Sequence, residues 1–248
     1  MLDNIKKLEG IREDEERPDA FLMIGQSNMA GRGEFGEVPE IKNPLCLMQR
    51  NGRWQPMSEP INPDRAIFSI TLHSGVGLAA SFADCYAKHF KRPVGLIPCA
   101  DGGTGITDWQ PEGALYENAM NCVRLAKRCS NIKGILWHQG ENDCLSMELL
   151  RAYPKAFYRM FDRLIADIGV PNIPIIVGEL PRGIDEKRHI DGRENIFNEY
   201  LPNLISRYSN MALASSEGLT LKPDGIHFTS LSLREFGKRY FEKYLELI

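Results

Sequence analysis

Short apolar runs alternate with longer amphipathic stretches along most of the chain. Each run spans only a few residues and is bounded by polar or turn-forming residues, which is typical of strands buried on both faces of a sheet. The expected strands cover residues 21–25, 45–49, 94–99, 134–138, 175–178 and 211–214.

The stretches between these runs place apolar residues at helical spacing. The expected helices cover residues 77–89, 115–128, 147–168, 194–206 and 232–247. In the last of them, Leu233, Phe236, Tyr240 and Tyr244 would share one face. The segment 51–62, which is rich in Pro, Asn and other polar residues, predicts a surface loop.

Strands that alternate with helices predict an α/β fold, in which a three-layer, doubly wound, mostly parallel sheet carries helices on both faces. The 248 residues contain no internal repeat, low-complexity tract or interdomain linker, so we expect a single domain spanning residues 1–248. In such folds the loops that leave the carboxyl ends of the strands meet at one edge of the sheet, where ligands bind. We therefore expect the chemistry in the residues that follow the strands.

Composition and charge exclude several classes of protein. Hydrophobic residues make up 43% and charged residues 25% of the chain, as in ordinary globular proteins. Lys and Arg number 30 against 33 Asp and Glu, so the basic excess of a nucleic-acid-binding protein is missing. Residues 1–19 lack the apolar segment of a secretory signal, and no apolar run approaches the roughly 20 residues that span a bilayer. We expect a cytoplasmic protein with neither a nucleic-acid nor a membrane partner; the sequence does not indicate its oligomeric state.

The cysteines and histidines do not predict a metal centre. The six cysteines are unevenly spaced and form no CxxC pair, which favours buried thiols over a zinc or redox site. His73, His138 and Asp143 have neither HExxH nor paired ligand spacing. The glycines of 101–105 lack the lysine and the spacing of a phosphate-binding loop. We expect no metal and no cofactor.

A candidate nucleophile follows the first expected strand. Ser27 lies where small and polar residues replace a hydrophobic run, which would place its hydroxyl at the edge of the sheet. A serine hydroxyl becomes a good nucleophile only when a base, usually a histidine oriented by a carboxylate, takes its proton. Among the five histidines, His227 alone has an acid nearby in a turn-rich setting after an expected strand, namely Asp224. Each piece taken alone would more often be an ordinary turn.

A third candidate group follows the fourth expected strand, at residues 137–143. Acyl transfer requires donors aimed at the developing oxyanion, and side-chain amides can supply them. Asn142 or Gln139 fits that role; the competing interpretation is that Asn142 or Asp143 caps the next helix.

Five blocks in order resemble the SGNH (GDSL-like) hydrolases, and most closely the branch that contains the sialate O-acetylesterase domain and the acetylxylan esterases of carbohydrate esterase family six. The string GQSNM stands at 25–29, and a glycine block followed by Phe-Ala stands at 76–83. A segment of the form glipca-GGT-I--W matches 95–109, WHQGE-D stands at 137–143, and the acid-x-x-His block stands at 224–227.

The resemblance implies a flavodoxin-like SGNH fold and assigns roles. Ser27 would be the nucleophile, His227 the base and Asp224 its orienting acid. The N–H groups of Ser27 and Gly77 would form the oxyanion hole with Asn142 or Gln139, although Leu78 stands where the family often has Pro, which leaves Gly75 as a second candidate donor.

Five further residues are expected at the substrate, and each has a structural alternative. Trp109 could stack on a sugar ring or pack in the core, and Glu141 could act as a second acid or tie loops together. Gln26, Gly103 and Thr104 complete this group of expected substrate-binding residues.

The resulting hypothesis is a serine esterase that removes acetyl groups from a carbohydrate, without a cofactor and with an acetylated saccharide as its partner. One alternative is an SGNH lipase, thioesterase or acyltransferase that acts on another acyl group. The other is a catalytically silent carbohydrate-binding protein. The choice among xylan fragments, sialic acids and other acetylated sugars depends on loop shape, which the sequence does not give.

Overall fold

One seven-stranded sheet forms the centre of the protein, as seen in a computed structural model that describes residues 16–63, 73–184 and 186–248. The strands lie in the order β3-β2-β4-β1-β5-β6-β7, and every neighbouring pair is parallel except β2 with β3. Their bounds are β1 Asp19–Gly25, β2 Cys46–Arg50, β3 Arg53–Pro56, β4 Val94–Pro98, β5 Asn131–His138, β6 Ile175–Gly178 and β7 Met211–Ala214.

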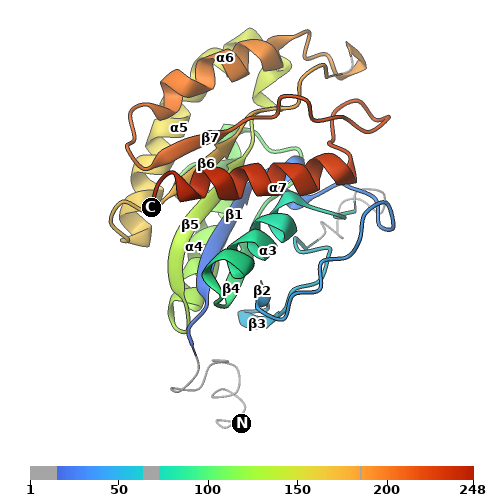
Figure 1. Cartoon of the computed structure of the whole chain (residues 1–248). Coiled ribbons are helices and arrows are strands. Elements are labelled where there is room, and N and C mark those ends of the chain that lie inside the picture. Colours follow the sequence, from blue (N-terminus) through green and yellow to red (C-terminus); the bar gives the residue numbers. More distant parts are fainter. Residues whose placement is uncertain (1–15, 64–72, 185) are drawn as a thin grey trace.

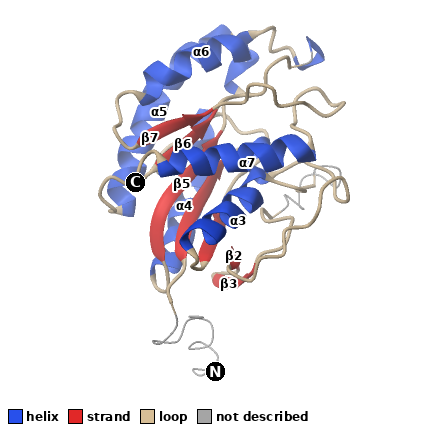
Figure 2. Ribbon diagram, in the orientation of Figure 1, coloured by secondary structure: helices blue, strands red, loops and turns tan. Residues whose placement is uncertain are grey.

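Helices cover both faces of the sheet (Figures 1 and 2). Helices α3 (Leu78–Phe90) and α7 (Ser230–Leu245) lie side by side on one face. Helices α4 (Ala114–Lys127), α5 (Met147–Ile168) and α6 (Arg193–Ile205) lie on the other. The short helix α2 (Ser27–Ala30) follows β1, and the 3-10 turns are η1 Ile106–Trp109, η2 Asp143–Leu145 and η3 Glu186–Arg188.

Each face of the sheet has its own apolar cluster. Phe21, Phe82 and Tyr244 meet edge to face under α3 and α7, where ring centroids lie 4.8 to 6.1 Å apart. Trp137 and Phe161 meet at 5.5 Å in the cluster under α4 and α5. Aromatic pairs of this geometry contribute beyond the area that they bury. The strands thus present apolar side chains to two cores, which explains their nearly continuous hydrophobic runs.

Helices α3 and α7 approach each other closely at Gly237. A Cβ atom at this position would lie 2.0 Å from the Leu78 carbonyl oxygen and 2.1 Å from Ser81 Oγ.

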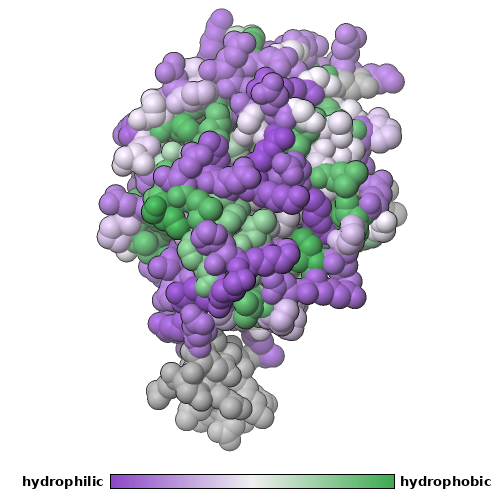
Figure 3. Space-filling model, viewed as in Figure 1, coloured by the Kyte–Doolittle hydropathy of each residue, from purple (hydrophilic) through white to green (hydrophobic). Residues whose placement is uncertain are grey.

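On the outer side of α7, hydrophilic side chains form a band across the middle of the view in Figure 3. The helix is therefore amphipathic, as its sequence pattern predicts.

The predicted α/β fold class is confirmed, and the predicted strands and helices are found with bounds shifted by at most three residues. Leu233, Phe236, Tyr240 and Tyr244 are all buried on the inner face of α7, as expected. The structure describes no membrane-length apolar helix among the residues it places.

The expected surface loop over residues 51–62 is wrong in part, because it contains strand β3. Asn51 and Gly52 have φ angles of 49° and 73°, and Arg50 pairs with Arg53 across them. A two-residue turn with two positive φ angles is the type I′ hairpin turn that Asn-Gly favours. The Asn-Gly signal predicts a hairpin here, and it outweighs the polar composition of the segment.

The order of the strands brings three loops to one place. Strand β1 lies between β4 and β5, and all three are parallel, so the loops after Gly25, Pro98 and His138 meet at the same edge. This is the kind of switch point at which open α/β sheets bind ligands.

Candidate active site

The turn after β1 exposes Ser27 at the carboxyl edge of the sheet. Gly25 has a φ angle of 130°, and a Cβ there would lie 2.1 Å from the His138 carbonyl oxygen, so only glycine fits. The Gln26 N–H donates to that same carbonyl at 2.9 Å, and helix α2 then begins at Ser27. The chain therefore reverses within two residues and holds the serine against β5.

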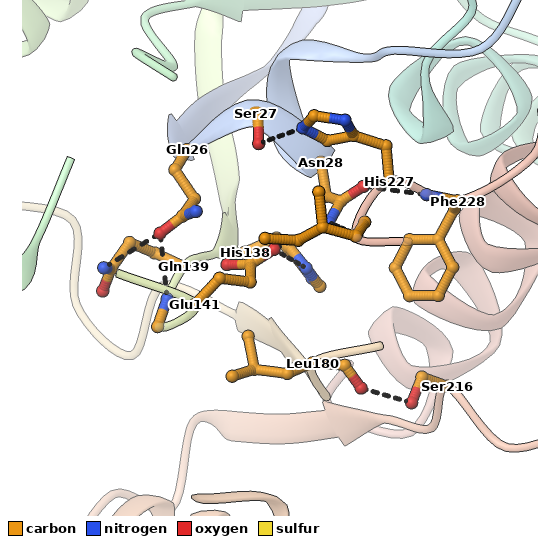
Figure 4. A network of polar contacts seen from close by, with 12 residues as sticks. Gln26, Ser27, Asn28, His138, Gln139, Glu141, Leu180, Ser216, His227 and Phe228 are labelled. Carbon is orange, nitrogen blue, oxygen red and sulfur yellow. Dashed lines mark hydrogen bonds and ion pairs between the residues drawn. The ribbon is translucent and has the colours of Figure 1, made fainter. Parts of the chain in front are cut away.

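Ser27, His227 and Asp224 form one hydrogen-bonded line, of which Figure 4 shows the contact between Ser27 and His227. Ser27 Oγ lies 2.9 Å from His227 Nε2, and His227 Nδ1 lies 2.9 Å from Asp224 Oδ2. The three side chains come from two segments 197 residues apart or more in the sequence, which the fold brings to one edge. This is the arrangement in which an imidazole can take the proton of a hydroxyl while a carboxylate fixes its tautomer.

A tight turn holds the acid and the histidine in register. Leu221 and Phe228 form a bridge, and Gly225, with a φ angle of 73°, donates its N–H to the Lys222 carbonyl at 2.9 Å. The other carboxylate oxygen, Asp224 Oδ1, accepts the backbone N–H groups of Ile226 at 3.1 Å and His227 at 3.0 Å. These backbone groups thus hold the carboxylate in place independently of its contact with the imidazole.

The surroundings lower the pKa values of both titratable members of this line. Burial lowers the pKa of His227, against the opposing effect of the Asp224 carboxylate. Burial alone would raise the pKa of Asp224, but the N–H groups of the turn and the His227 ring hold it below its usual value. At neutral pH the pair is therefore a neutral imidazole beside a carboxylate, the state in which a general base acts.

A cavity of about 400 Å³ opens over Ser27 and His227. Its wall combines the loops after β1, β4 and β5 with residues from two later segments. The lining residues are Gln26, Ser27, Arg32, Gly102, Gly103, Glu141, Asn142, Leu145, Arg188, Ile190, Ile226 and His227.

The structure brings only one of the two expected side-chain amides to this cavity. Asn142 lines it and donates from Nδ2 to the Gly103 carbonyl at 2.9 Å, which leaves its second N–H for another acceptor. Gln139 is 1% exposed, and its Nε2 donates to Gln26 Oε1, the Thr104 carbonyl and Asp143. The expectation that Gln139 could serve the oxyanion therefore needs correction, because its amide already bonds three buried acceptors.

The glycine expected beside the oxyanion needs the same correction. The Gly77 N–H donates to the Glu59 carboxylate at 2.8 Å, and Gly77 does not line the cavity. The glycine that approaches the nucleophile is Gly102, since a Cβ built on it would lie 3.6 Å from Ser27 Cβ. Gly75 has the same difficulty as Gly77, because its backbone packs on Gly33 rather than in the cavity.

Two of the residues expected to touch substrate are part of the core. Trp109 is 1% exposed, packs edge to face on Trp137 at 5.8 Å, and donates from Nε1 to Thr104 Oγ1 at 3.0 Å. Thr104 is itself buried and donates to the Asp101 carbonyl. Of the two interpretations for Trp109, core packing is thus the one that the structure supports, and the pair braces the loop that carries Gly102 and Gly103.

Gln26, Gly103 and Glu141 do line the cavity, but the two side chains are used mainly for support. Gln26 Oε1 accepts N–H groups of Gly140 and Asn142 at 3.4 and 3.5 Å, which ties the nucleophile turn to the loop after β5. Glu141 is 1% exposed, and its Oε1 accepts from Asn28 Nδ2 at 2.7 Å (Figure 4).

Six cavity residues are not among the expected site residues, namely Arg32, Gly102, Leu145, Arg188, Ile190 and Ile226. Arg32 follows the nucleophile string and Ile226 precedes His227, so proximity to the motifs could have indicated them. Arg188 and Ile190 belong to a loop that carries no motif. Only the fold shows that this loop returns to the active edge, where Arg188 donates twice to the Asp224 carbonyl, at 2.9 and 2.6 Å.

Among the described residues, no cluster of His, Cys, Asp and Glu side chains has the composition of a metal centre. The site consists instead of a hydroxyl, an imidazole, a carboxylate and amide groups. A doubly wound, mostly parallel sheet that carries a hydroxyl, an imidazole and a carboxylate in line beyond its carboxyl edge has the groups of a serine-hydrolase site.

The comparisons with known proteins narrow this class. The model of the family described as "Carbohydrate esterase, sialic acid-specific acetylesterase" matches residues 17–246, and the chain belongs to that family. It is 29% identical over 247 residues to a protein of Arabidopsis thaliana named "Probable carbohydrate esterase", with 91% of this chain and 89% of the relative covered.

Solved structures share the same fold. An X-ray structure of an Arabidopsis thaliana protein matches with a TM-score of 0.80 and 28% identity over 93% of this chain and 99% of that one. NanS matches with a TM-score of 0.71 and 17% identity over 94% and 98% of the two chains. A carbohydrate acetylesterase from Xanthomonas citri matches with a TM-score of 0.65 and 16% identity over 92% of this chain and 56% of that one.

Proposed function

We propose that the protein hydrolyses O-acetyl esters of a saccharide, with Ser27 as nucleophile, His227 as general base and Asp224 as the acid that orients the base. The observation that carries this proposal is the unbroken line of two 2.9 Å contacts from Ser27 Oγ through the imidazole to Asp224, at the floor of an open cavity. Membership of a carbohydrate esterase family supports an ester as the bond that is cleaved and a saccharide as the substrate that carries it.

In the first half of the reaction, His227 Nε2 takes the proton of Ser27 Oγ while the oxygen attacks the acetyl carbonyl carbon. The tetrahedral oxyanion that forms is held by the Ser27 N–H, the second N–H of the Asn142 amide and the Gly102 loop. The imidazolium then gives its proton to the sugar oxygen, the bond from the acetyl carbon to that oxygen breaks, and the saccharide leaves.

In the second half, His227 takes a proton from a water molecule that attacks the acetyl group on Ser27. The same oxyanion donors act again, the proton passes to Ser27 Oγ, and acetate departs. Asp224 stays ionised throughout, because two backbone N–H groups and the ring N–H all favour its charged form.

The short apolar part of the cavity lining favours a short acyl group over a long one. Leu145, Ile190 and Ile226 are its apolar side chains, and Arg32, Arg188 and Asn142 contribute polar ones. A long-chain lipase requires an extended apolar groove, so rates on p-nitrophenyl esters should fall steadily from acetate to octanoate. A preference for octanoate would contradict the acetylesterase proposal and favour the lipase alternative.

The direct test is acetate release from acetylated xylo-oligosaccharides, O-acetylated sialic acids and other acetylated sugars. Purified protein should release acetate from at least one of them, and Ser27→Ala should lower the rate by about 10³-fold or more. Absence of release from every sugar, or equal release by Ser27→Ala, would refute the proposal. Lack of both ester hydrolysis and serine labelling would favour the silent binding protein.

A further inference from the structure

Asn28, the residue after the nucleophile, bonds to the backbone on both sides of His227. Its Nδ2 donates to the Ile226 carbonyl at 3.2 Å, and its Oδ1 accepts the Phe228 N–H at 3.1 Å. Asn28 is fully buried and does not line the cavity. The amide thus pairs with the histidine's chain as an adjacent strand would, through one donor and one acceptor (Figure 4).

Glu141 fixes which end of that amide faces which partner. The other Nδ2 hydrogen goes to Glu141 Oε1 at 2.7 Å, and an ionised carboxylate can only accept. The nitrogen must therefore face Glu141 and Ile226, and the oxygen must face Phe228. A reversed amide would set its oxygen against two acceptors and its nitrogen against a donor.

A buried imidazole lies beside this carboxylate. His138 Nε2 lies 3.4 Å from Glu141 Oε1, and both side chains are at most 1% exposed. Burial alone would raise the pKa of Glu141, but His138 and Asn28 hold it below its usual value. Glu141 is thus an acceptor that does not change with pH in the range where the enzyme would work.

Ser27 and Asn28 are adjacent on helix α2, and Ile226, His227 and Phe228 are adjacent on the other segment. The distance between Ser27 Oγ and His227 Nε2 therefore depends on the hydrogen bonds between their immediate neighbours in the chain. Displacement of a catalytic group by about 1 Å can lower a rate by about 100-fold.

We propose that Asn28 is a positioning residue that holds His227 at reaction distance from Ser27, and that Glu141 orients the Asn28 amide for this purpose. The inference rests on the proposed function, since it concerns the same line of Ser27, His227 and Asp224. It predicts that Asn28→Ala lowers kcat on p-nitrophenyl acetate by about 100-fold while KM changes less than about twofold, because Asn28 does not touch the cavity.

Asn198 provides a matched control for the loss of a buried amide. It is 3% exposed, and its side chain pairs with the Leu180 N–H at 2.8 Å and the Leu180 carbonyl at 3.0 Å, as Asn28 pairs with the chain at His227. Asn198→Ala should lower the unfolding temperature comparably and leave kcat per folded molecule within about threefold of the wild type.

A charge-swapped pair tests the orienting role of Glu141. Asn28→Asp keeps the acceptor for Phe228 but sets a second carboxylate against Glu141. It should therefore have a lower kcat than the other single variant, Glu141→Gln. Adding Glu141→Gln restores a donor between the two side chains, so the double variant should have a kcat at least tenfold higher than that of Asn28→Asp. No recovery in a folded double variant would contradict the orienting role.

Imidazole NMR separates this inference from the catalytic proposal. In the wild type the His227 Nδ1–H should give one sharp low-field proton resonance, and in Asn28→Ala it should broaden or move, whether or not the protein turns over any ester. If that resonance is unchanged and kcat falls no further than in Asn198→Ala, the positioning role is refuted. If the resonance changes but the wild type cleaves no ester, the positioning role stands and the proposed function fails.

Discussion

Burial of His227 has a consequence for the pH at which the protein acts. Because burial lowers the pKa of the imidazole, we expect the acid limb of kcat/KM to have its midpoint below the ordinary histidine value of about 6.5. The sign follows from chemistry, since only the neutral ring can accept the Ser27 proton, so activity falls as pH falls through that pKa. A pH profile on p-nitrophenyl acetate measures it, and a midpoint above 6.5 would contradict the role of burial.

Asp143 predicts a pH effect on stability that is separate from catalysis. Burial raises the pKa of its carboxyl from 3.8 to about 6, although Gln139 and the Ile106 N–H oppose the shift. Between these values the folded state binds the proton more tightly than the unfolded state, so this contribution to stability is full below pH 4 and is lost as pH rises through 6.

The variant Asp143→Asn removes that titration and keeps an oxygen for the Ile106 N–H. Its unfolding free energy relative to the wild type should therefore rise between pH 4 and pH 7 in urea titrations. A difference between variant and wild type that does not depend on pH would argue against the raised pKa.

At the residue scale, the sequence indicates side chains better than it indicates their contacts. Ser27, Asp224 and His227 follow predicted strands or lie in a compact turn, so their meeting could be anticipated from topology. Nothing near Gly77 signals that its N–H bonds Glu59, which lies 18 residues earlier in an irregular segment. Trp109 is equally ambiguous in sequence, because an indole next to a glycine-rich loop suits either a sugar or a core.

At the scale of elements, the contact between α3 and α7 depends on Gly237. Alanine in a helix interior is intrinsically better than glycine by about 1 kcal/mol. A Cβ atom here, however, would meet backbone atoms of Leu78 and Phe82 that cannot move independently of α3. Overpacking costs about 1–3 kcal/mol, and a Cβ only 2.0 Å from a backbone oxygen belongs in the upper part of that range, so the contact outweighs the propensity gain.

Gly237→Ala should thus lower the unfolding free energy by about 1–2 kcal/mol after the propensity gain, with activity per folded molecule unchanged. Lys238→Ala, at the exposed adjacent position, should change it by less than about 0.5 kcal/mol. Urea denaturation of both variants compares them, and a Gly237→Ala protein as stable as the wild type would show that the helices can separate without cost.

Periodicity located the long helices well because each has an apolar face that must be buried, and α5 has the predicted bounds. Strand β3 was missed for a physical reason. It is an edge strand with mostly exposed residues, so it lacks the apolar run on which the other strands were recognised. Its signal lay in the Asn51-Gly52 turn, which polar composition alone does not reveal.

At the scale of the whole molecule, one sheet serves two apolar clusters. Strands β1, β5 and β6 contribute to both, so neither cluster can be lost without exposing strands that the other needs. We therefore expect one cooperative unfolding transition, the behaviour of a chain that folds as one domain. Far-UV circular dichroism and tryptophan fluorescence should give coincident urea curves, and separate midpoints would contradict the single domain.

The fold class follows from the alternation of elements, but the order of the strands does not. Alternation is compatible with several parallel orders, and long-range packing selects the one in which β1 lies between β4 and β5. That order places Gly102 and Asn142 on either side of Ser27, so the cavity around the expected catalytic residues is seen only in the structure. The cytoplasmic location remains a prediction.

The most direct measurement is covalent labelling of the folded protein with a fluorophosphonate, followed by mass spectrometry of its peptides. A serine activated by the imidazole should carry one adduct on the peptide that contains Ser27, with no adduct in Ser27→Ala and a rate reduced by about 10³-fold or more in His227→Ala. An adduct on another serine, or equal labelling of the His227→Ala protein, would contradict the account.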